Sequence, residues 1–259
     1  MNIAGQRVWV IGAGFLGRAL SSRCAAAGAA VVMIDIDPAV APQVCGDSAD
    51  PVTYARARQC SGGLPAVVFC CPATHGGTVA DYRHCYVGTA QALSNLGLAG
   101  RCVFCSSTSV YGTPTERTAA LSEAERLIGC AGGCVARLVP IYGRGRCELL
   151  RRHLAGEPRL PGEANRVLNY VHVDDAAAAL LLLAERECSG YCDVCGESFT
   201  KARAYELLAE LTGIPAAGAD APPSHRSATT AAIIPHTLRE LGWVPQQLFA
   251  DFVREQLRG

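Results

Sequence analysis

Two residues suited to proton transfer follow an apolar run near the middle of the chain. Ser107 and Tyr111 lie in "SSTSVYG", directly after "RCVFC". A serine hydroxyl can orient a substrate carbonyl, and a tyrosine can exchange a proton with its oxygen. Tyrosine ordinarily has a pKa of about 10, and the only lysine that could lower it, Lys201, lies far along the chain. Ser107 and Tyr111 are therefore the catalytic candidates; the alternative is that Tyr111 only packs in a structural turn.

A glycine-rich segment near the start predicts a dinucleotide site. "GAGFLG" places Gly12, Gly14 and Gly17 between a strand-like run and a helical pattern. In this motif the first glycine permits a tight turn, the second lets a pyrophosphate approach the backbone, and the third allows close helix–strand packing. Phe15 and Leu16 begin the helix, whose free N–H groups would face the phosphates.

An acidic residue after the second strand-like run predicts which dinucleotide binds. Asp35 lies near the position, about 20 residues downstream, where a carboxylate accepts hydrogen bonds from the ribose hydroxyls. A carboxylate there repels a 2′-phosphate, and no arginine follows directly to receive one. These features favour NAD over NADP. The rival residue is Asp37, in which case Asp35 only caps a turn.

The elements that must position these groups alternate between strand and helix. Apolar runs alternate with segments of helical periodicity, and these runs are Arg7–Ile11, Ala30–Ile34, "PAVVFCC", "RCVFCSS" and "CVARLVPIYG". Such alternation predicts an α/β fold with a Rossmann-type, doubly wound parallel sheet and right-handed crossovers. Ligands of such sheets bind at the carboxyl ends of the strands.

The regular alternation ends in the second half of the chain, which predicts two domains. Residues 1–143 form the expected NAD-binding Rossmann domain, and residues 167–196 return to it. Residues 144–166 and 197–259 form a small, mostly helical C-terminal substrate lobe. The ligand cleft is expected between the two.

Composition excludes several classes of function. The chain of 259 residues carries 23 basic and 23 acidic side chains, so no electrostatic argument favours nucleic acid or an anionic membrane. It shows neither a secretory signal nor a run long enough to span a bilayer. We therefore expect a cytoplasmic protein.

The chain contains 14 cysteines, and their placement favours buried thiols in a reducing compartment. Four lie in apolar strand-like runs: Cys70, Cys71, Cys102 and Cys105. Cys188, Cys192 and Cys195 have the C-x3-C-x2-C spacing of radical iron–sulfur enzymes. However, "GYCDVC" is typical of a strand, in which an offset of three puts Cys192 and Cys195 on opposite faces. No metal site is predicted.

Taken in order, the motifs resemble those of the extended short-chain dehydrogenase/reductase group, the NAD-dependent epimerase/dehydratase family. Besides "GAGFLG" and "SSTSVYG", the similar segments are "GDSADP", "FCCPATHGG", "ARLVPIYGRGR", "VHVDDAAAAL" and "LRELGWVP". The resemblance implies that Ser107 is the catalytic serine and that Asp47 contacts adenine. The other cofactor-binding positions that it implies are Ser48, Pro72, Ala73 and Pro140.

The sequence lacks the Tyr-x-x-x-Lys pair by which this family generally works. With Glu125 on the family's usual glutamate, Arg117 stands at the tyrosine position and Leu121 at the lysine position. Lys201 has no tyrosine four residues before it, so no register restores the pair. Ile11 also replaces a family glycine, and the segment after "VYG" is short. These departures are typical of the atypical branch, which keeps the fold and cofactor motif without the standard active site.

Further polar residues follow the expected strands and predict contacts with a substrate. These candidates are His75, Arg117, Tyr142, Arg144 and Arg146. Arg144 and Arg146 either hold a phosphate or carboxylate bidentately or lie on a solvated loop. In "HVDD", Asp174 or Asp175 is expected to cap the next helix, and His172 to fix the turn.

The sequence thus predicts an NAD-dependent oxidoreductase or epimerase/dehydratase-like enzyme with a non-standard active site. Its substrate would be a small oxygenated metabolite or a nucleotide sugar. The alternative is a non-catalytic NAD(P)(H)-binding sensor or regulatory protein on the same fold. The helix in "VADYRHCYVGTAQAL" can form a homodimer face, although its apolar stripe serves a core equally well.

Overall fold

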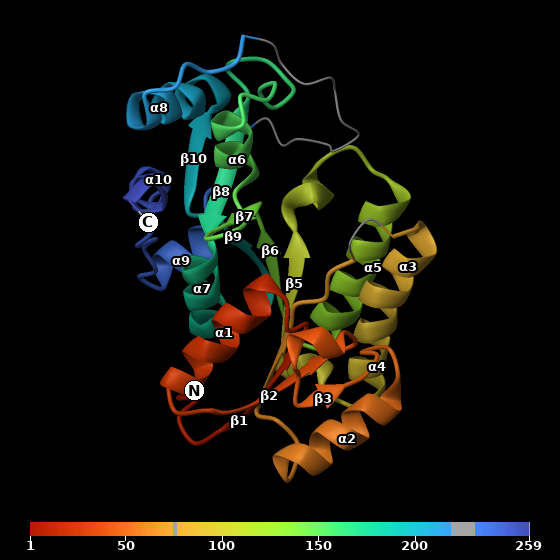
Figure 1. The fold of residues 1–259 in the computed structure, drawn as a ribbon. Coiled ribbons are helices and arrows are strands. Elements are labelled where there is room, and N and C mark those ends of the chain that lie inside the picture. The colour runs from red at the N-terminus through yellow and green to blue at the C-terminus, as the bar shows by residue number, and fades with distance from the viewer. Residues whose placement is uncertain (75–76, 219–230, 259) are drawn as a thin grey trace.

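The computed structural model describes residues 1–74, 77–218 and 231–258, and within these its main element is a seven-stranded sheet (Figure 1). The strand order is β3-β2-β1-β4-β5-β6-β9, and all neighbours are parallel. The strands are β1 Arg7–Ile11, β2 Ala30–Asp35, β3 Val44–Cys45, β4 Val67–Cys70, β5 Cys102–Ser107, β6 Cys134–Leu138 and β9 Gly190–Val194. The predicted doubly wound parallel sheet is confirmed.

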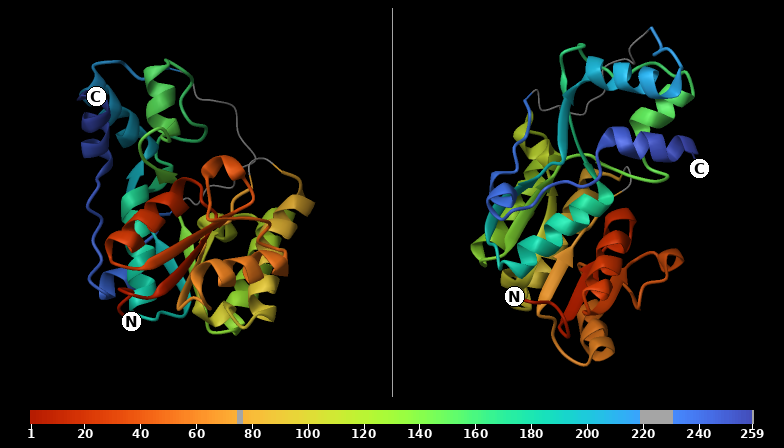
Figure 2. Two further views of the ribbon diagram at one scale, coloured as in Figure 1. Left: turned by 60° about the horizontal axis from the view of Figure 1, so that its bottom comes forward. Right: turned by 90° about the vertical axis from the view of Figure 1, so that its left-hand side faces the viewer.

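Helices cover both faces of this sheet, which explains why its strands are continuously apolar (Figure 2). One face carries α1 Phe15–Ala26 and α7 Val173–Glu185. The other face carries α2 Pro51–Ser61, α3 Val79–Arg83, a π-helical turn His84–Gly88, α4 Thr89–Asn95 and α5 Glu116–Cys130. Short 3₁₀ turns are Pro38–Val40, Ala99–Arg101 and Thr108–Tyr111. Along β1, Trp9 and Val10 are buried on opposite faces, so each strand contributes to two cores.

A smaller lobe extends beyond the carboxyl ends of β5 and β6 (Figure 1). Its sheet, in the order β10-β8-β7, consists of β10 Glu197–Thr200, β8 Val167–His172 and β7 Ile141–Tyr142. Its helices are α6 Glu148–Leu154, α8 Lys201–Thr212 and α10 Phe249–Arg258. The lobe has a core of its own, which includes Tyr142, Leu208 and Phe249. It is thus a mixed α/β lobe, because β8 pairs antiparallel with β10 outside the large sheet.

Part of the C-terminal segment returns to the large sheet. Helix α9, His236–Glu240, packs against β9. Leu238 and Trp243 are buried in the core beneath α1 and α7. Residues 236–258 therefore contact both parts of the molecule, and the sequence-based division into two domains stays a proposal.

The start of α7 differs from the expected aspartate cap. His172 is the N-cap residue, and its Nδ1 accepts a hydrogen bond from the Asp174 N–H at 3.3 Å. Asp175 is buried, and its carboxylate accepts from the backbone N–H groups of Gln246 and Gln247, both at 2.9 Å. Asp175 therefore anchors the C-terminal segment, and the expected structural role of His172 is confirmed.

The expectation of buried thiols holds only in part, since seven cysteines are buried, four are partly accessible, and Cys45, Cys60 and Cys130 are exposed. All fourteen, each within the described ranges, are free thiols. Strand β9 ends at Val194, so Cys195 lies beyond it and is buried in the same core as Cys192, contrary to the expected opposite faces. In the described part of the chain, no three potential ligands gather as a metal site would require. No helix there is long and apolar enough to span a membrane.

Candidate functional site

The glycine-rich turn joins β1 to α1 at the carboxyl edge of the sheet. Gly12 has φ +88°, and a Cβ there would lie 2.2 Å from the carbonyl oxygen of Cys71. A Cβ on Gly17 would lie 1.8 Å from the Gly12 oxygen. By contrast, no described atom lies within 4 Å of the place where a Cβ on Gly14 would be. The turn thus combines close backbone packing with open space at the amino end of α1, where free N–H groups favour an anion.

Asp35 ends β2 beside this turn. Its Oδ2 accepts a hydrogen bond from the Ala13 N–H at 2.6 Å, and its Oδ1 accepts from the Asp37 N–H at 2.9 Å. Asp37 instead caps the following 3₁₀ turn by accepting from the Ala39 N–H at 2.9 Å. The geometry therefore supports Asp35, rather than Asp37, as the carboxylate next to a ligand on the glycine turn.

Asp47 and Ser48, at the expected adenine end, are both engaged by residues that the sequence did not single out. Asp47 Oδ1 accepts from the Ala49 N–H at 2.8 Å, and Oδ2 lies 2.7 Å from Nε2 of His84. Partial burial opposes the charged form of Asp47, but these two partners hold its pKa below the usual value. Ser48 Oγ lies 2.6 Å from the hydroxyl of Thr89. His84 belongs to the π-helical turn, a distortion frequent at functional sites.

The loop after β4 forms the next part of this edge. Pro72 is buried and Ala73 is exposed. The hydroxyl of Thr74 is buried and has no hydrogen-bond partner in residues 1–74, 77–218 and 231–258. His75 lies outside the described residues. Pro140, exposed at the end of β6, accepts a hydrogen bond from β8 at 3.2 Å. Thr74, which sequence reasoning missed, therefore has an unsatisfied hydroxyl in the loop that follows β4.

The two catalytic candidates have different surroundings. Ser107 ends β5 and its Oγ accepts from the Ser109 N–H at 3.2 Å. The Tyr111 hydroxyl donates to Asp193 at 2.7 Å and accepts from Arg137 at 3.1 Å. Burial and the bond to Asp193 raise the pKa of Tyr111 above its usual value, although Arg137 opposes this. The Tyr111 hydroxyl is thus hydrogen-bonded to Asp193 on edge strand β9, and this favours a structural role for Tyr111.

Helix α5 carries Arg117 and Leu121, the residues that the sequence places at the positions of the family's usual pair. Leu121 is buried against the sheet. Arg117 donates to the carbonyl of Gly77 at 2.7 Å and lies 5.8 Å from the centre of the Tyr82 ring. Arg117 therefore braces the loop after β4, rather than presenting a free charge to a substrate.

The remaining substrate candidates separate into a buried and an exposed group. Tyr142 is buried in the lobe and its hydroxyl donates to the Gln247 carbonyl at 2.9 Å, so the expectation that it contacts substrate is not supported. Arg144 and Arg146 are exposed. The Arg146 guanidinium lies 5.3 Å from the centre of the Phe15 ring, at the first residue of α1. Arg146 therefore brings a positive charge to the amino end of that helix.

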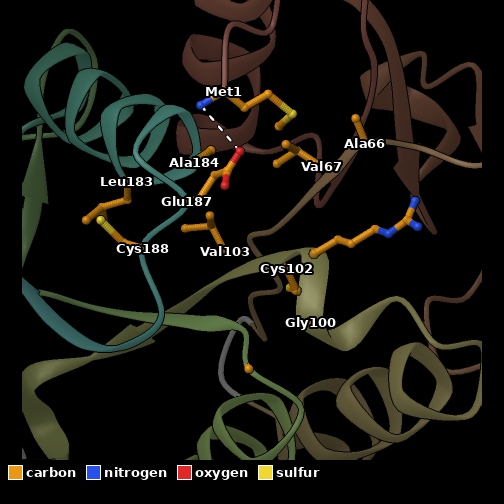
Figure 3. Close-up of a pocket in the computed structure, with 12 residues that line it drawn as sticks. Met1, Ala66, Val67, Gly100, Cys102, Val103, Leu183, Ala184, Glu187 and Cys188 are labelled. Carbon is orange, nitrogen blue, oxygen red and sulfur yellow. Dashed lines mark ion pairs between the residues drawn. The ribbon is translucent and has the colours of Figure 1, made fainter.

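A separate hollow of about 240 Å³ lies at the opposite edge of the sheet (Figure 3). Its lining includes Val67 and Cys102, the first residues of β4 and β5. Met1 and Glu187 also line it, and the Met1 ammonium nitrogen lies 3.6 Å from Oε1 of Glu187 (Figure 3). Because the glycine turn and Ser107 lie at the carboxyl ends of the strands, this hollow is not part of the candidate site.

Neither family models nor curated proteins match this sequence. Solved structures match it along almost its whole length. UDP-glucose 4-epimerase from Thermus thermophilus, in complex with NAD, is 22% identical with a TM-score of 0.77, over 98% of this chain and 99% of that one. UDP-glucose 4-epimerase from Thermotoga maritima, with UDP-glucose, is 20% identical with a TM-score of 0.77, over 97% and 98%. dTDP-glucose 4,6-dehydratase from Bacillus anthracis, in complex with NAD, is 14% identical with a TM-score of 0.78, over 98% and 96%.

The parallel sheet, the glycine turn and these matches define the class: a Rossmann-type α/β protein with a lobe at the carboxyl edge of its sheet. More narrowly, the fold is the one seen in these UDP-glucose 4-epimerases and this dTDP-glucose 4,6-dehydratase.

Proposed function

We propose that this chain binds NAD along the glycine turn. Three features of the described residues fit that cofactor: the space beside Gly14, the carboxylate of Asp35 and the unpartnered hydroxyl of Thr74. The amino end of α1 would hold the pyrophosphate, and Asp35 would accept from the ribose hydroxyls. Several proteins of the same fold were crystallised with NAD. NAD supplies a hydride acceptor when bound; the side chains here bind and orient it.

Replacing Asp35 by asparagine should weaken NAD binding and reduce the preference over NADP. Asparagine keeps an oxygen that can accept from Ala13 but removes the charge that repels a 2′-phosphate. We expect Kd for NAD to rise by about tenfold, or 1.4 kcal/mol. Titration calorimetry with NAD⁺, NADH, NADP⁺ and NADPH measures the effect.

The matched control is Asp37→Asn, because Asp37 only caps the neighbouring turn. This variant should bind NAD within about twofold of the wild type, below 0.5 kcal/mol. A larger loss in Asp37→Asn than in Asp35→Asn would exchange the two assignments. Failure of the wild type to bind any of the four dinucleotides would overturn the proposed cofactor.

We further propose that the protein is an epimerase/dehydratase-like enzyme acting on a nucleotide sugar. The observation that carries this is the position of Arg146, from the lobe, at the amino end of α1. A guanidinium there can bind a diphosphate bidentately. Ser107, at the end of β5, can orient a sugar oxygen, since its hydroxyl keeps a proton to donate while it accepts from Ser109. The T. maritima neighbour was crystallised with UDP-glucose.

Replacing Arg146 by alanine should weaken binding of UDP to the NAD-loaded protein. Loss of a charge-assisted contact to phosphate costs about 1.5–3 kcal/mol, which corresponds to a rise in Kd of more than about tenfold. Calorimetric titration with UDP, in the presence of saturating NAD, measures it. The control is Arg254→Ala on α10, where the arginine donates to Asp251 of the same helix, and this variant should leave Kd unchanged. Equal affinities in both variants would remove Arg146 from the site.

The alternative function is a non-catalytic NAD-binding sensor. It is favoured by the burial of Leu121 at the lysine position and by the engagement of Tyr111 with Asp193. Incubation with NAD and UDP-sugars, followed by nuclear magnetic resonance of the sugar and absorbance of NADH, separates the two functions. An enzyme converts sugar, and Ser107→Ala slows it at unchanged NAD affinity. A sensor binds NAD with no conversion.

Location and assembly remain part of the proposal. The free state of all fourteen cysteines, each described, fits a reducing compartment such as the cytoplasm. Helices α3 and α5 are linked on the surface by an ion pair of 2.7 Å between Arg83 and Glu123. A second copy packed on residues 79–93, which include α3, would give the homodimer that the sequence suggested.

A further inference from the structure

Two thiols meet directly behind the glycine turn. Cys71 is the first residue after β4 and Cys105 lies in β5, and their Sγ atoms are 3.3 Å apart. Cys105 is buried, whereas Cys71 is partly accessible. The Cys71 carbonyl is the group that a Cβ on Gly12 would strike at 2.2 Å. The backbone of Cys71 therefore forms part of the wall of the candidate cofactor site.

The strand register places these two cysteines opposite each other. Cys70 pairs with Phe104 in the parallel ladder, so the next positions along both strands are Cys71 and Cys105. Neighbouring strands lie about 4.8 Å apart, within the Cα separation of about 4.4–6.8 Å that a disulfide requires. The backbone is thus already spaced for an S–S bond.

Two further thiol pairs of the described sheet lack this register. Cys70 contacts Cys102, and Cys134 contacts Cys192. The residue opposite Cys70 is two positions beyond Cys102, and the residue opposite Cys192 is two positions beyond Cys134. Diagonal positions offset by two residues are about 7–8 Å apart, too far for a disulfide without backbone movement. These pairs serve as internal controls.

We propose that Cys71 and Cys105 form a redox-active dithiol, which a peroxide oxidises to a disulfide. The disulfide weakens binding at the adjacent glycine turn. The part concerning binding rests on the proposed NAD-binding function; the oxidation does not. Intracellular disulfides of this kind are characteristically transient and redox-sensing.

The oxidation proceeds in two balanced steps. The Cys71 sulfur attacks one oxygen of the peroxide, the O–O bond breaks, and Cys71 sulfenic acid and water form. The Cys105 sulfur then attacks the Cys71 sulfur; the S–S bond forms, the S–O bond breaks, and the thiol proton leaves with the hydroxide as a second water. Two electrons pass from the dithiol to the peroxide. A hydrogen bond with Cys71, together with burial, raises the pKa of Cys105, which therefore retains its proton until the second step.

Closure has a geometric consequence for the turn. The two sulfurs must approach from 3.3 Å to about 2.05 Å. The Cys71 N–H is held by the Ile11 carbonyl at 2.7 Å, so movement of Cys71 is transmitted to the end of β1 and to Gly12. We expect the oxidised protein to bind NAD about tenfold more weakly, a change of 1.4 kcal/mol.

The first test locates the disulfide. The full-length protein is treated with stoichiometric hydrogen peroxide, alkylated, digested and mapped by mass spectrometry. We expect a linked Cys71–Cys105 peptide that dithiothreitol releases. The link should persist in Cys102→Ala and vanish in Cys71→Ala. Cys71 is partly accessible, so its variant can be measured even if Cys105→Ala does not fold. A predominant link between other cysteines, or stable sulfenic acid at Cys71, would overturn the dithiol.

The second test measures NAD affinity by calorimetry before and after oxidation. Tenfold weakening that dithiothreitol reverses, and that Cys71→Ala lacks, supports the switch. Unchanged affinity in a protein shown to carry the disulfide overturns the switch. If the reduced protein does not bind NAD at all, the proposed function fails, whereas the peptide map still decides the dithiol.

Discussion

Replacing Gly14 by alanine should abolish measurable NAD binding while leaving the fold intact. Gly14 has φ −73°, which any residue adopts, and a Cβ there meets no described atom within 4 Å. The added methyl group would occupy the space in which a pyrophosphate approaches the backbone. We expect Kd to rise by at least about a hundredfold, or 2.7 kcal/mol, with Tm unchanged. Calorimetric titration and thermal unfolding measure the two quantities.

The matched variants Gly12→Ala and Gly17→Ala should lose stability instead. Alanine at Gly12 is strained at φ +88° and lies 2.2 Å from the Cys71 oxygen, and alanine at Gly17 lies 1.8 Å from the Gly12 oxygen. Strain and overpacking of this kind each cost about 1–3 kcal/mol. If Gly14→Ala binds NAD normally, the open space is not the pyrophosphate site. If Gly14→Ala also unfolds, the distinction between packing and binding glycines is wrong.

The sequence could predict this turn because its requirements are local. Gly12 needs a positive φ and Gly17 needs close approach of two backbones, and only one residue type meets those conditions. Continuous apolar strands predicted a sheet covered on both faces for the same reason. Asp35 followed from its place at the end of β2, although only the structure separated it from Asp37.

What the sequence could not predict depends on contacts between distant residues. Tyr111 matches a motif, but its role is decided by Asp193, 82 positions away on the edge strand. Asp47 meets His84 through a π-helical turn, which has no residue signature. Tyr142 follows β6 at the carboxyl edge of the sheet, yet it is buried in the core of the lobe and its hydroxyl donates to the Gln247 carbonyl. Local pattern therefore located the edge of the sheet that carries the site, and tertiary packing determined which side chains are free there.

An ion pair next to the candidate site, between the buried Glu125 and the partly buried Arg137, should contribute strongly to stability. Glu125 on α5 is 1% exposed. It accepts from Arg137 Nε at 3.0 Å, from Arg137 Nη2 at 2.7 Å and from the Ser106 hydroxyl at 2.6 Å. In Glu125→Ala these three donors would lose the carboxylate that accepts from them. Removing one partner of a buried pair costs about 3–5 kcal/mol, because the other charge is left uncompensated.

In urea unfolding, Glu125→Ala should therefore have a free energy of unfolding about 3–5 kcal/mol below that of the wild type. The control is Glu210→Ala, which breaks an exposed pair with Arg203 and should lower that free energy by less than about 1 kcal/mol. If Glu125→Ala does not fold, the milder Glu125→Gln provides the measurement. The double variant Glu125→Leu/Arg137→Met should recover much of the loss, since it removes both charges together. A loss below about 1 kcal/mol in Glu125→Ala would mean that water reaches Arg137 and replaces the carboxylate. In that case the pair would not fix α5 to the end of β5. Ser107 would then be positioned by β5 and not by the ion pair.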